Sequence, residues 1–579
     1  MEIRRREELE DDNEKWVRDS SVDHRGNTPL RAFTGVWKAS FFIIVFEFAE
    51  KLCAFGLSSN LIIYLTKVLH QDLKTAAKNV NYWGGVSTMT PLIGGFIADT
   101  YLGRFYMVLL SSAIYLAGLF LLSMSQFIPS LKPTKSLNLH KVVFYIAMFM
   151  TSIASGGYKP GIQSFGADQF DESHINERKK KMSFFDWWNF GLCSGMLLGV
   201  TVISYVEDNV SWGFGYSFMA LVMFISFSVF IFGRKYYRYQ HPKGSPLTPL
   251  IQVLVAAMSK RHLVLPSDAK HLYEVAEPAK CDRRLLCHTD RFRFLEKAAI
   301  IEHQYDNIAF EAEKLNRWRL SSVTQVEEMK LILSIIPIWL TSLAFNISFA
   351  ETPLFIKQAS IGNTKISTGF NIPPASLFSL LAISMIITII FFDKILEPCL
   401  RRIKRKDRGI SILQRIGIGM VFSITAMIVA GIIENERLED GAFMSIFRLF
   451  PQFMIMGLAD GFTIVGLQEF FYDQVPDNMR SLGMALYFSN VGVANFLGSM
   501  LITLVDNVTR RGGNNSWFAK DLNGSRLDKF YWLLAGINAV NLCVYIFVAS
   551  RHTYKSVRVK VSKDETVRVP EREDNNDHV

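Results

Sequence analysis

The chain has 579 residues, of which 50% are hydrophobic and 20% are charged, and its formal net charge is +10. A set of soluble domains of this length would carry about 25% charged residues, whereas here the charges are concentrated in residues 1–36, 234–330 and 551–579. The apolar runs between these segments approach the roughly 20 residues that cross a bilayer, which predicts an all-α membrane protein with many spans.

The first predicted element is a cytosolic tail at residues 1–36, which is highly charged and lacks the apolar segment of a cleavable signal peptide. The first membrane helix is therefore expected to direct insertion by itself. The six cysteines lie mostly in apolar or basic segments without metal-ligand spacing; they are Cys53, Cys193, Cys281, Cys287, Cys399 and Cys543. The sequence predicts no disulfide framework, no metal site and no cofactor.

Twelve apolar runs predict about twelve transmembrane helices. Their centres lie near residues 50, 88, 116, 151, 196, 223, 342, 385, 422, 460, 492 and 540. Six runs precede the polar middle of the chain and six follow it. We therefore predict two six-helix bundles at residues 37–233 and 328–550, a cytosolic linker with surface helices at 234–327 and a cytosolic tail at 551–579. Two such bundles are expected to hold a substrate path between them.

The first predicted span contains the stretch FEFAEKL, in which Glu47, Glu50 and Lys51 share one helical face. An ionised side chain at the bilayer centre costs about 2.5–3.5 kcal/mol, so this face is expected to point into the protein or into a watery cavity. Burial and mutual repulsion favour the protonated carboxyl, whereas the lysine favours the carboxylate. The group is therefore suited to exchanging a proton near neutral pH. The alternative is a structural charge cluster that ties helices together.

The stretch SPLTPLIQVLVAAMSKRHLVLP, residues 245–266, is an apolar cluster followed by basic residues. Two interpretations fit this pattern. The segment is either a helix that lies along the inner membrane surface or an ordinary linker helix packed on the bundles.

Charges at the ends of the spans predict that both termini are cytosolic. In this topology the inside loops hold basic runs such as residues 178–181 and 401–406, and the outside loops hold acidic stretches such as residues 207–208 and 434–440. The basic excess then belongs to the membrane flanks and does not indicate nucleic acid. Four sequons also fall in the predicted outside loops, at Asn209, Asn507, Asn514 and Asn523. The plasma membrane is our first expectation, and the vacuolar membrane is the alternative.

Several further motifs accompany the E-x-x-E-[K/R] pattern of the first span. They are GGFIADTYLGR at residues 94–104, FGADQFDE at 165–172, FFDWWNFGLC at 184–193, WRLSSVTQVEEMK at 318–330 and LQEFFYDQVP at 467–476. Together they resemble the proton-coupled nitrate/peptide transporter family of the major facilitator superfamily, and its plant branch in particular, over roughly residues 30–555. The resemblance implies the fold of that superfamily. It does not fix the substrate, since the family transports nitrate, peptides, plant hormones and specialised metabolites.

The resemblance implies roles for five charged residues. Glu47, Glu50 and Lys51 match the proton-coupling triad of the family, whose third position is often arginine. Lys159 in the fourth span and Glu469 in the tenth match a lysine and a glutamate that form a salt bridge between the bundles. A proton on Glu469 or an anion near Lys159 would weaken this tie and so couple binding to bundle opening. A static strut between the bundles is the alternative.

Three residues at the cytosolic end of the second span, Asp99, Gly103 and Arg104, resemble the inner-gate charge motif of the superfamily. Other positions depart from the family. Nitrate transport can depend on a histidine in the seventh span, but none of the 11 histidines lies in the spans of the second bundle. Peptide transporters often carry tyrosines after the triad, where residues 53–56 read CAFG here. Both departures weaken the expectation of a nitrate or peptide substrate.

The stretch FAETPLF, residues 349–355, places Glu351 in the outer part of the seventh span, where plant relatives often have glutamine. In a pocket, this carboxylate would favour a cationic or amine-bearing substrate or supply another protonation site. Pro353 is expected to kink the helix nearby. Alternatively, Glu351 lies near the outer surface and is simply hydrated.

We therefore predict a proton-coupled symporter of a small solute that works by alternating access, with protons, the solute and the lipid bilayer as its partners. The alternative is a transporter-like sensor with little flux of its own. No Gly-rich phosphate loop, nucleophile elbow or metal motif in the sequence indicates an enzyme or an ATP-driven pump.

Overall fold

The computed structural model describes residues 15–17, 19, 21–171, 174–240, 242, 244, 247–265, 272–273, 289–301, 316, 318–367, 370–405, 409–440, 444–476, 479–511, 516–519 and 522–554. Several sequence predictions fall outside these residues. They are residues 1–14 and 555–579 of the predicted tails, much of the predicted linker, Cys281, Cys287 and the sequon at Asn514.

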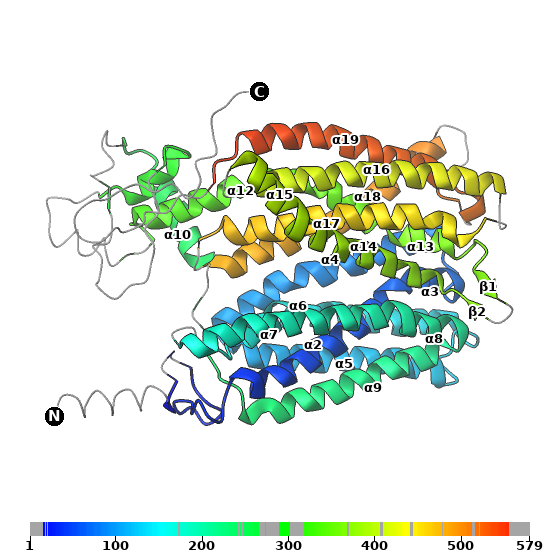
Figure 1. Ribbon diagram of the computed structural model, residues 1–579, viewed down its shortest axis with the longest axis horizontal. Helices are drawn as coiled ribbons and strands as arrows, with labels where there is room; N and C mark the ends of the chain where they lie inside the picture. Colours follow the sequence, from blue (N-terminus) through cyan, green and yellow to red (C-terminus); the bar gives the residue numbers. More distant parts are fainter. Residues whose placement is uncertain are drawn as a thin grey trace. The chain divides into compact units, whose positions relative to one another are not determined.

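The helices before the linker follow the predicted spans and are shown in Figure 1. They are α2 (Val36–Ser59), α3 (Leu61–Lys67), α4 (Leu73–Ile97), α5 (Arg104–Phe127), α6 (Leu137–Ala167), α7 (Ile175–Leu198), α8 (Ser204–Asn209) and α9 (Trp212–Phe232). Two π-helical turns, η1 (Ala98–Leu102) and η2 (Gly199–Ile203), continue α4 and α7, and the 3₁₀ turn η3 (Gly233–Lys235) follows α9.

The remaining helices begin in the linker. They are α10 (Leu247–Ser259), α12 (Val323–Ala350), α13 (Pro353–Ala359), α14 (Phe378–Phe391), α15 (Glu397–Lys404), α16 (Ile412–Asp440), α17 (Phe450–Asp473), α18 (Arg480–Arg511) and α19 (Leu527–Ser550). The shorter helical turns are η5 (Arg293–Ala299), η6 (Pro374–Leu377), η7 (Phe392–Leu396), η9 (Ile446–Leu449) and η11 (Leu522–Gly524). Two short antiparallel strands, β1 (Lys365–Ser367) and β2 (Phe370–Asn371), form a hairpin after α13.

Each of the twelve predicted span centres lies inside a helix. Ten helical stretches are long and apolar enough to cross a membrane by length and composition, within the residues that the structure describes. The helices α2 and α4 are outside this group. The first carries Glu47, Glu50 and Lys51 in its middle, and the second is rich in Asn, Ser, Thr and Gly. Both helices thus carry polar side chains within a predicted span, which indicates that these side chains face something other than lipid.

The chain divides into two compact units. The first comprises Met1–Gly244, Ser342–Gly466 and Phe488–Cys543, and the second comprises Ser245–Thr341, Leu467–Tyr487 and Val544–Val579. The first unit thus holds helices of both predicted bundles, and α12, α17, α18 and α19 contribute residues to both units. The units differ from the predicted domains, whose boundaries stay predictions.

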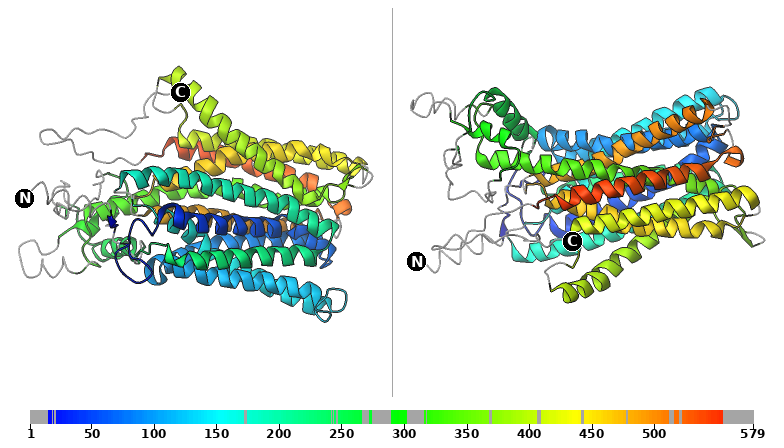
Figure 2. Two further views of the ribbon diagram at one scale, coloured as in Figure 1. Left: turned by 60° about the horizontal axis from the view of Figure 1, so that its bottom comes forward. Right: turned by 90° about the horizontal axis from the view of Figure 1, so that it is seen from above.

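Aromatic rings fill much of the core of the N-terminal helices. The ring of Phe230 on α9 lies 5.3 Å from that of Phe46 on α2 and 5.6 Å from that of Phe105 on α5, measured between centroids. Phe165 on α6 lies 5.9 Å from Phe105. Each such ring pair contributes about 0.5–1.5 kcal/mol beyond the burial of its area. The same helices run alongside one another, blue to green, in Figures 1 and 2.

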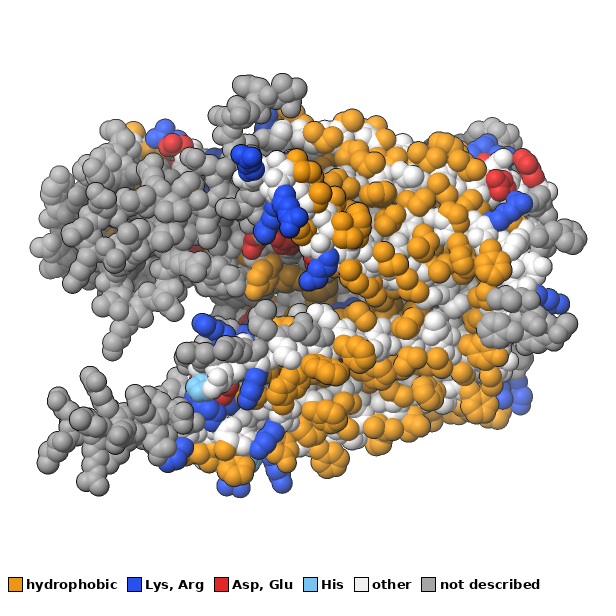
Figure 3. Space-filling model, viewed as in Figure 1, with side chains coloured by type: hydrophobic (Ala, Val, Ile, Leu, Met, Phe, Trp, Pro, Cys, Tyr) orange, Lys and Arg blue, Asp and Glu red, His pale blue; other side chains and the backbone are white. Residues whose placement is uncertain are grey.

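The outward face of α9 is as apolar as its inward face. It exposes Phe214, Phe218, Leu221, Phe224, Ile225 and Phe232. Figure 3 shows that hydrophobic side chains cover the middle of the helices, with lysines and arginines near their ends. A helix that is hydrophobic on all sides is typical of a membrane span.

Two glycines allow α4 and α6 to touch backbone to backbone. A Cβ atom on Gly94 would collide with the carbonyl group of Gly156, and a Cβ on Gly156 would lie 2.7 Å from the carbonyl oxygen of Thr90. Small residues permit this close approach between membrane helices. Consequently α4 and α6 form one tightly packed pair.

Candidate functional site

The three ionisable residues in the middle of α2 meet on one side of the helix, as their spacing predicted. Lys51 Nζ lies 3.2 Å from Glu47 Oε1 and 2.6 Å from Glu50 Oε2. Glu47 is 3% exposed and Glu50 is fully buried. One ammonium thus faces two buried carboxylates, so the formal charge of the group is −1 unless one carboxylate holds a proton. Such a group is chemically able to take up and release one proton.

The helix α7 packs directly behind this group. A Cβ atom on Gly195 of α7 would collide with the carbonyl oxygen of Phe48 and would lie 3.1 Å from the Cβ of Lys51. The absence of a side chain at Gly195 therefore lets the two helices meet at the level of the charges. A larger residue at position 195 would therefore push α7 away from α2 at the level of the charges.

Lys159 lies on α6 beside the polar helix α4. Its ammonium donates a hydrogen bond of 3.2 Å to the carbonyl oxygen of Ser87 on α4. Within the ranges that the structure describes, no ion pair to Lys159 is present. A neutral carbonyl does not balance the charge of a half-buried ammonium, so Lys159 is suited to receiving an anionic group.

Two acidic residues of α17, Glu469 and Asp460, are candidates for the acidic partner in the predicted salt bridge between the bundles. Glu469 is half-buried and belongs to the second unit, whereas Lys159 belongs to the first. Asp460 belongs to the first unit and is 0% exposed. Neither carboxylate oxygen of Asp460 has a hydrogen-bond partner among the described residues. A buried carboxylate of this kind is expected to hold a proton or to meet a cation.

Our sequence interpretation missed Asp460. The signal was present, because Asp460 stands at the centre of the tenth predicted span, where an acidic residue is a functional candidate by default. The resemblance to family motifs pointed instead to the glutamate in LQEFFYDQVP, which lies nine residues later.

Helices of the two predicted bundles contact one another through polar side chains inside the first unit. Lys74 Nζ on α4 lies 2.8 Å from Asp506 Oδ2 on α18. Lys357 on α13 donates a hydrogen bond of 3.0 Å to the hydroxyl of Thr66 on α3. These contacts join the two halves of the chain by side chains that are able to separate without breaking a helix.

Glu351 lies at the end of α12, where this helix meets α4 and α18. It is 2% exposed, so the alternative of a hydrated residue at the surface is wrong. Its Oε1 accepts a hydrogen bond of 2.9 Å from the amide of Asn81 on α4. The same oxygen is 2.6 Å from where a Cβ on Gly498 of α18 would lie. The carboxylate is therefore enclosed by both halves of the chain.

The residues predicted for the inner gate gather around Arg104, at the start of α5. Arg104 Nη1 lies 2.7 Å from Asp168 Oδ2, and Arg104 Nε lies 3.4 Å from Asp99 Oδ1. Gly103 has φ of 78°, a left-handed conformation that favours glycine and turns the chain sharply from η1 into α5. Asp168, which belongs to the FGADQFDE motif, is the stronger partner of Arg104, and the sequence had given it no role.

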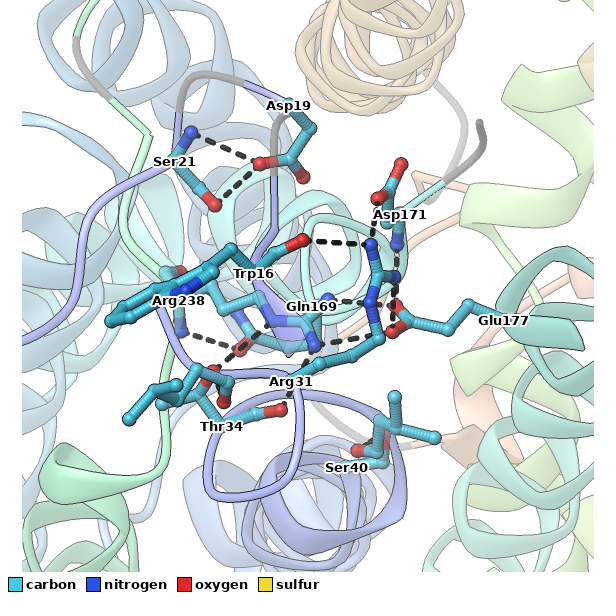
Figure 4. A network of polar contacts seen from close by, with 12 residues as sticks. Trp16, Asp19, Ser21, Arg31, Thr34, Ser40, Gln169, Asp171, Glu177 and Arg238 are labelled. Atoms are coloured by element: carbon cyan, nitrogen blue, oxygen red, sulfur yellow. Dashed lines mark hydrogen bonds and ion pairs between the residues drawn. The ribbon is translucent and has the colours of Figure 1, made fainter. Parts of the chain in front are cut away.

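The FGADQFDE motif also takes part in a network of arginines and acids, shown in Figure 4. Arg238 is fully buried, and its Nη1 lies 2.7 Å from Glu177 Oε2. Arg31 bridges Glu177 Oε1 at 2.8 Å and Asp171 Oδ2 at 3.0 Å. Burial alone would lower the pKa of Arg31, but its bonds to Glu177 and Asp171 outweigh burial and raise that pKa. The network fastens the N-terminal segment to the start of α7 and to the segment after α9.

Comparison with known proteins places this chain among membrane transporters. The sequence model described as PTR2, the POT family, matches residues 105–518. Two Arabidopsis thaliana proteins, named Protein NRT1/ PTR FAMILY 5.6 and Protein NRT1/ PTR FAMILY 5.7, are 53% and 52% identical to this chain. The alignments cover 95% of this chain in both cases, and 96% and 93% of the two relatives.

Solved structures show the same fold. The crystal structure of an auto inhibited POT family peptide transporter matches with a TM-score of 0.69 at 19% identity, over 91% of this chain and 99% of that chain. The in meso crystal structure of the POT family transporter PepTSo matches with a TM-score of 0.67 at 19% identity, over 89% and 98% of the two chains. These likenesses confirm the predicted fold class.

Proposed function

Because this chain belongs to the POT family, and is therefore a multi-pass membrane transporter of the NRT1/PTR kind, we propose that it is a proton-coupled symporter of a small solute. The observation that supports proton coupling best is the group of two buried carboxylates and one lysine in the middle of α2. In the proposed cycle this group takes up a proton on one side of the membrane and releases it on the other. Both termini are cytosolic in this proposal, and the plasma membrane is the expected location.

We assign the coupling between proton and solute to Lys159 and an acidic residue of α17. A solute anion or carboxylate that approaches Lys159 competes with that acid for the ammonium, and a proton on the acid has the same effect. Each ligand thus favours one arrangement of the two bundles, which is what a shift between inward-facing and outward-facing states requires. Asp460 and Glu469 are the two candidates for the acid.

Two further clusters are proposed as gates at the ends of the path. The pair Lys74–Asp506 links α4 to α18, and its opening would separate the two halves there. Arg104 with Asp99 and Asp168 would serve the predicted inner gate. The pairs of Arg104 suit such a role, because partly exposed ion pairs contribute only about 0–1 kcal/mol each and are easily exchanged for water.

Uptake into oocytes that express the full chain tests the proposal. Nitrate, dipeptides and plant hormones are offered at acidic and at neutral external pH, and accumulation is compared with that in water-injected oocytes. We expect at least one solute to accumulate above its external concentration at acidic pH only. A protein that reaches the surface and moves none of these solutes at either pH would support the sensor alternative instead.

We predict that Glu351→Gln changes which charge on a substrate is preferred. The glutamine keeps a hydrogen bond to Asn81 but removes a buried negative charge at the meeting point of α4, α12 and α18. The uptake ratio of cationic to anionic solutes should fall by about tenfold, which corresponds to about 1.4 kcal/mol. Competition between amine-bearing and carboxylate-bearing solutes measures this ratio at several pH values.

The matched control for Glu351→Gln is Glu436→Gln on α16, which removes an equally charged side chain that is about half exposed and pairs with Arg448 at the surface. It should leave selectivity unchanged. If Glu351→Gln transports with the selectivity and pH dependence of the unsubstituted protein, Glu351 has no role in the pocket.

A further inference from the structure

The linker helix α10 uses one face to pack inside the second unit. Leu250, Val253, Ala256 and Ala257 of α10 form a buried cluster with residues of η5 and of the first turns of α12. At the end of α10, the ammonium of Lys260 donates a hydrogen bond of 2.6 Å to the carbonyl oxygen of Ile300. This face of α10 therefore packs against other helices, as the interpretation of residues 245–266 as an ordinary linker helix predicts.

A second face of α10 is also apolar, and its side chains are exposed to solvent. Leu247, Ile251, Val255 and Met258 are 36%, 50%, 41% and 71% exposed. At 100° per residue, these four positions fall within an arc of about 80°. The polar residues of the helix, such as Thr248 and Ser259, occupy only a narrow arc beside it. Water is a poor solvent for such a stripe, which marks it as an interaction surface.

The turn that leads into η5 presents aromatic and cationic side chains together. The sequence Arg291-Phe292-Arg293-Phe294 is exposed at every position, with Phe292 39% and Phe294 56% exposed. Phe292 has φ of 49°, a left-handed conformation that is uncommon for an aromatic residue. The two rings lie 6.3 Å apart in an edge-to-face arrangement. The fold thus holds two phenylalanines out of the core, with an arginine before each.

The stripe on α10 and this turn belong to one folded piece. Lys297 of η5 donates a hydrogen bond of 2.6 Å to the carbonyl oxygen of Arg261, just after α10. Arg261 itself is exposed, and Val264 beyond it is 90% exposed. The acidic Glu296 is buried against Lys330, so its charge is already balanced. The exposed arginines of this piece, which are Arg261, Arg291 and Arg293, outnumber the exposed Asp290, so its net exposed charge is positive.

We propose that this piece, the α10 stripe together with residues 291–294, docks on the anionic phospholipid headgroups of the adjoining membrane leaflet. The position in the chain supports this partner, since α10 packs against the first turns of α12, a helix long and apolar enough to cross a membrane. Apolar side chains enter the boundary between headgroups and acyl chains, while arginines bind the phosphates. Aromatic rings favour the same depth. The linker is then a lipid-sensing element of the transporter.

Hydrogen exchange of the full-length protein in lipid nanodiscs tests this proposal. Discs of phosphatidylcholine alone are compared with discs that also contain phosphatidylserine. We expect residues 247–259 and 291–300 to exchange more slowly in the anionic discs, by about fivefold for each arginine that engages a headgroup. The membrane-spanning helices should exchange equally in both. Equal exchange of residues 247–259 in the two kinds of disc would overturn the proposal.

Two double substitutions separate the charged and the apolar parts of the surface. Arg261→Gln with Arg293→Gln should remove the dependence on phosphatidylserine. Ile251→Asp with Val255→Asp should abolish protection in either disc, and because both positions are exposed, its unfolding temperature in detergent should match that of the unsubstituted protein. Protection that survives both double substitutions, or that rises with protein concentration whatever the lipid, contradicts lipid docking and indicates a protein partner.

The matched control for charge is Lys132→Gln with Lys135→Gln, in the exposed connection between α5 and α6. It removes the same total charge as the arginine substitutions but leaves the proposed surface intact. The response to phosphatidylserine should be retained. Loss of the response in this control would show that the effect follows net charge and not the site.

Discussion

Replacement of Glu50 by glutamine is expected to abolish proton-driven accumulation of substrate, with a loss of about 100-fold or more. The carboxylate of Glu50 is fully buried and lies 2.6 Å from the ammonium of Lys51. Glutamine has nearly the same shape, but its amide does not ionise and so cannot take up and release a proton as a carboxyl group does. Lys51 retains Glu47 at 3.2 Å, so no buried charge is left alone and the protein should still fold. Glu47→Gln is expected to have the same effect for the same reason.

The measurement separates transport from its driving force. Both variants should lose uptake against a concentration gradient, while exchange of labelled for unlabelled substrate across the membrane persists. Lys51→Arg tests the charge separately from the geometry, because it retains the positive charge but replaces the ammonium by a planar guanidinium. Unchanged accumulation in Glu47→Gln and in Glu50→Gln would show that the proton is carried elsewhere.

Neutralising Lys159 is expected to reduce uptake by at least about tenfold, and neutralising its acidic partner should do the same. The partner is identified by two double-mutant cycles, one that combines Lys159→Gln with Asp460→Asn and one that combines it with Glu469→Gln. Residues that form a functional pair show coupling of about 0.5–3 kcal/mol, whereas independent residues are additive within about 0.5 kcal/mol. We expect coupling for Asp460, because its buried carboxylate has no hydrogen-bond partner among the described residues.

The cycle with Glu469 is the internal comparison, since both acids stand on α17 and both variants conserve side-chain size. Surface expression of each single variant is measured first, so that lost uptake is not mistaken for lost protein. Coupling to Glu469 alone would restore the pair that the family motifs indicate. If both cycles are additive, Lys159 acts without either acid.

The sequence predicted the helices well because their signal is local. Runs of apolar residues located helices at all twelve predicted centres, including α2, which holds three charged residues in its middle, and α4, which is rich in small polar residues. The spacing of Glu47, Glu50 and Lys51 also predicted their contact, since a helix brings residues three and four positions apart onto one face. These inferences needed no information about how the helices pack.

Contacts between distant parts of the chain were beyond such reasoning. Arg31 and Glu177 are separated by 146 positions, and no spacing rule connects them. The pairing of Arg104 with Asp168 and the enclosure of Glu351 between α4 and α18 likewise depend on which helices are neighbours. Asp460 differs from these residues, because an acidic residue at the centre of a predicted span is a functional candidate from the sequence alone.

The direct contact between Gly94 and Gly156 predicts that α4 and α6 move as one rigid pair. No side chain separates the two backbones at this point, so we expect the two helices to move together. We therefore expect Lys159 on α6 to keep its contact with Ser87 on α4 when the protein changes state. The groups near Lys159 that change are then those of the helices on the opposite side of the proposed substrate path. A pair of spin labels, one on α4 and one on α6, would provide an internal reference distance. We expect the distance between them to stay constant while distances that cross the proposed substrate path change.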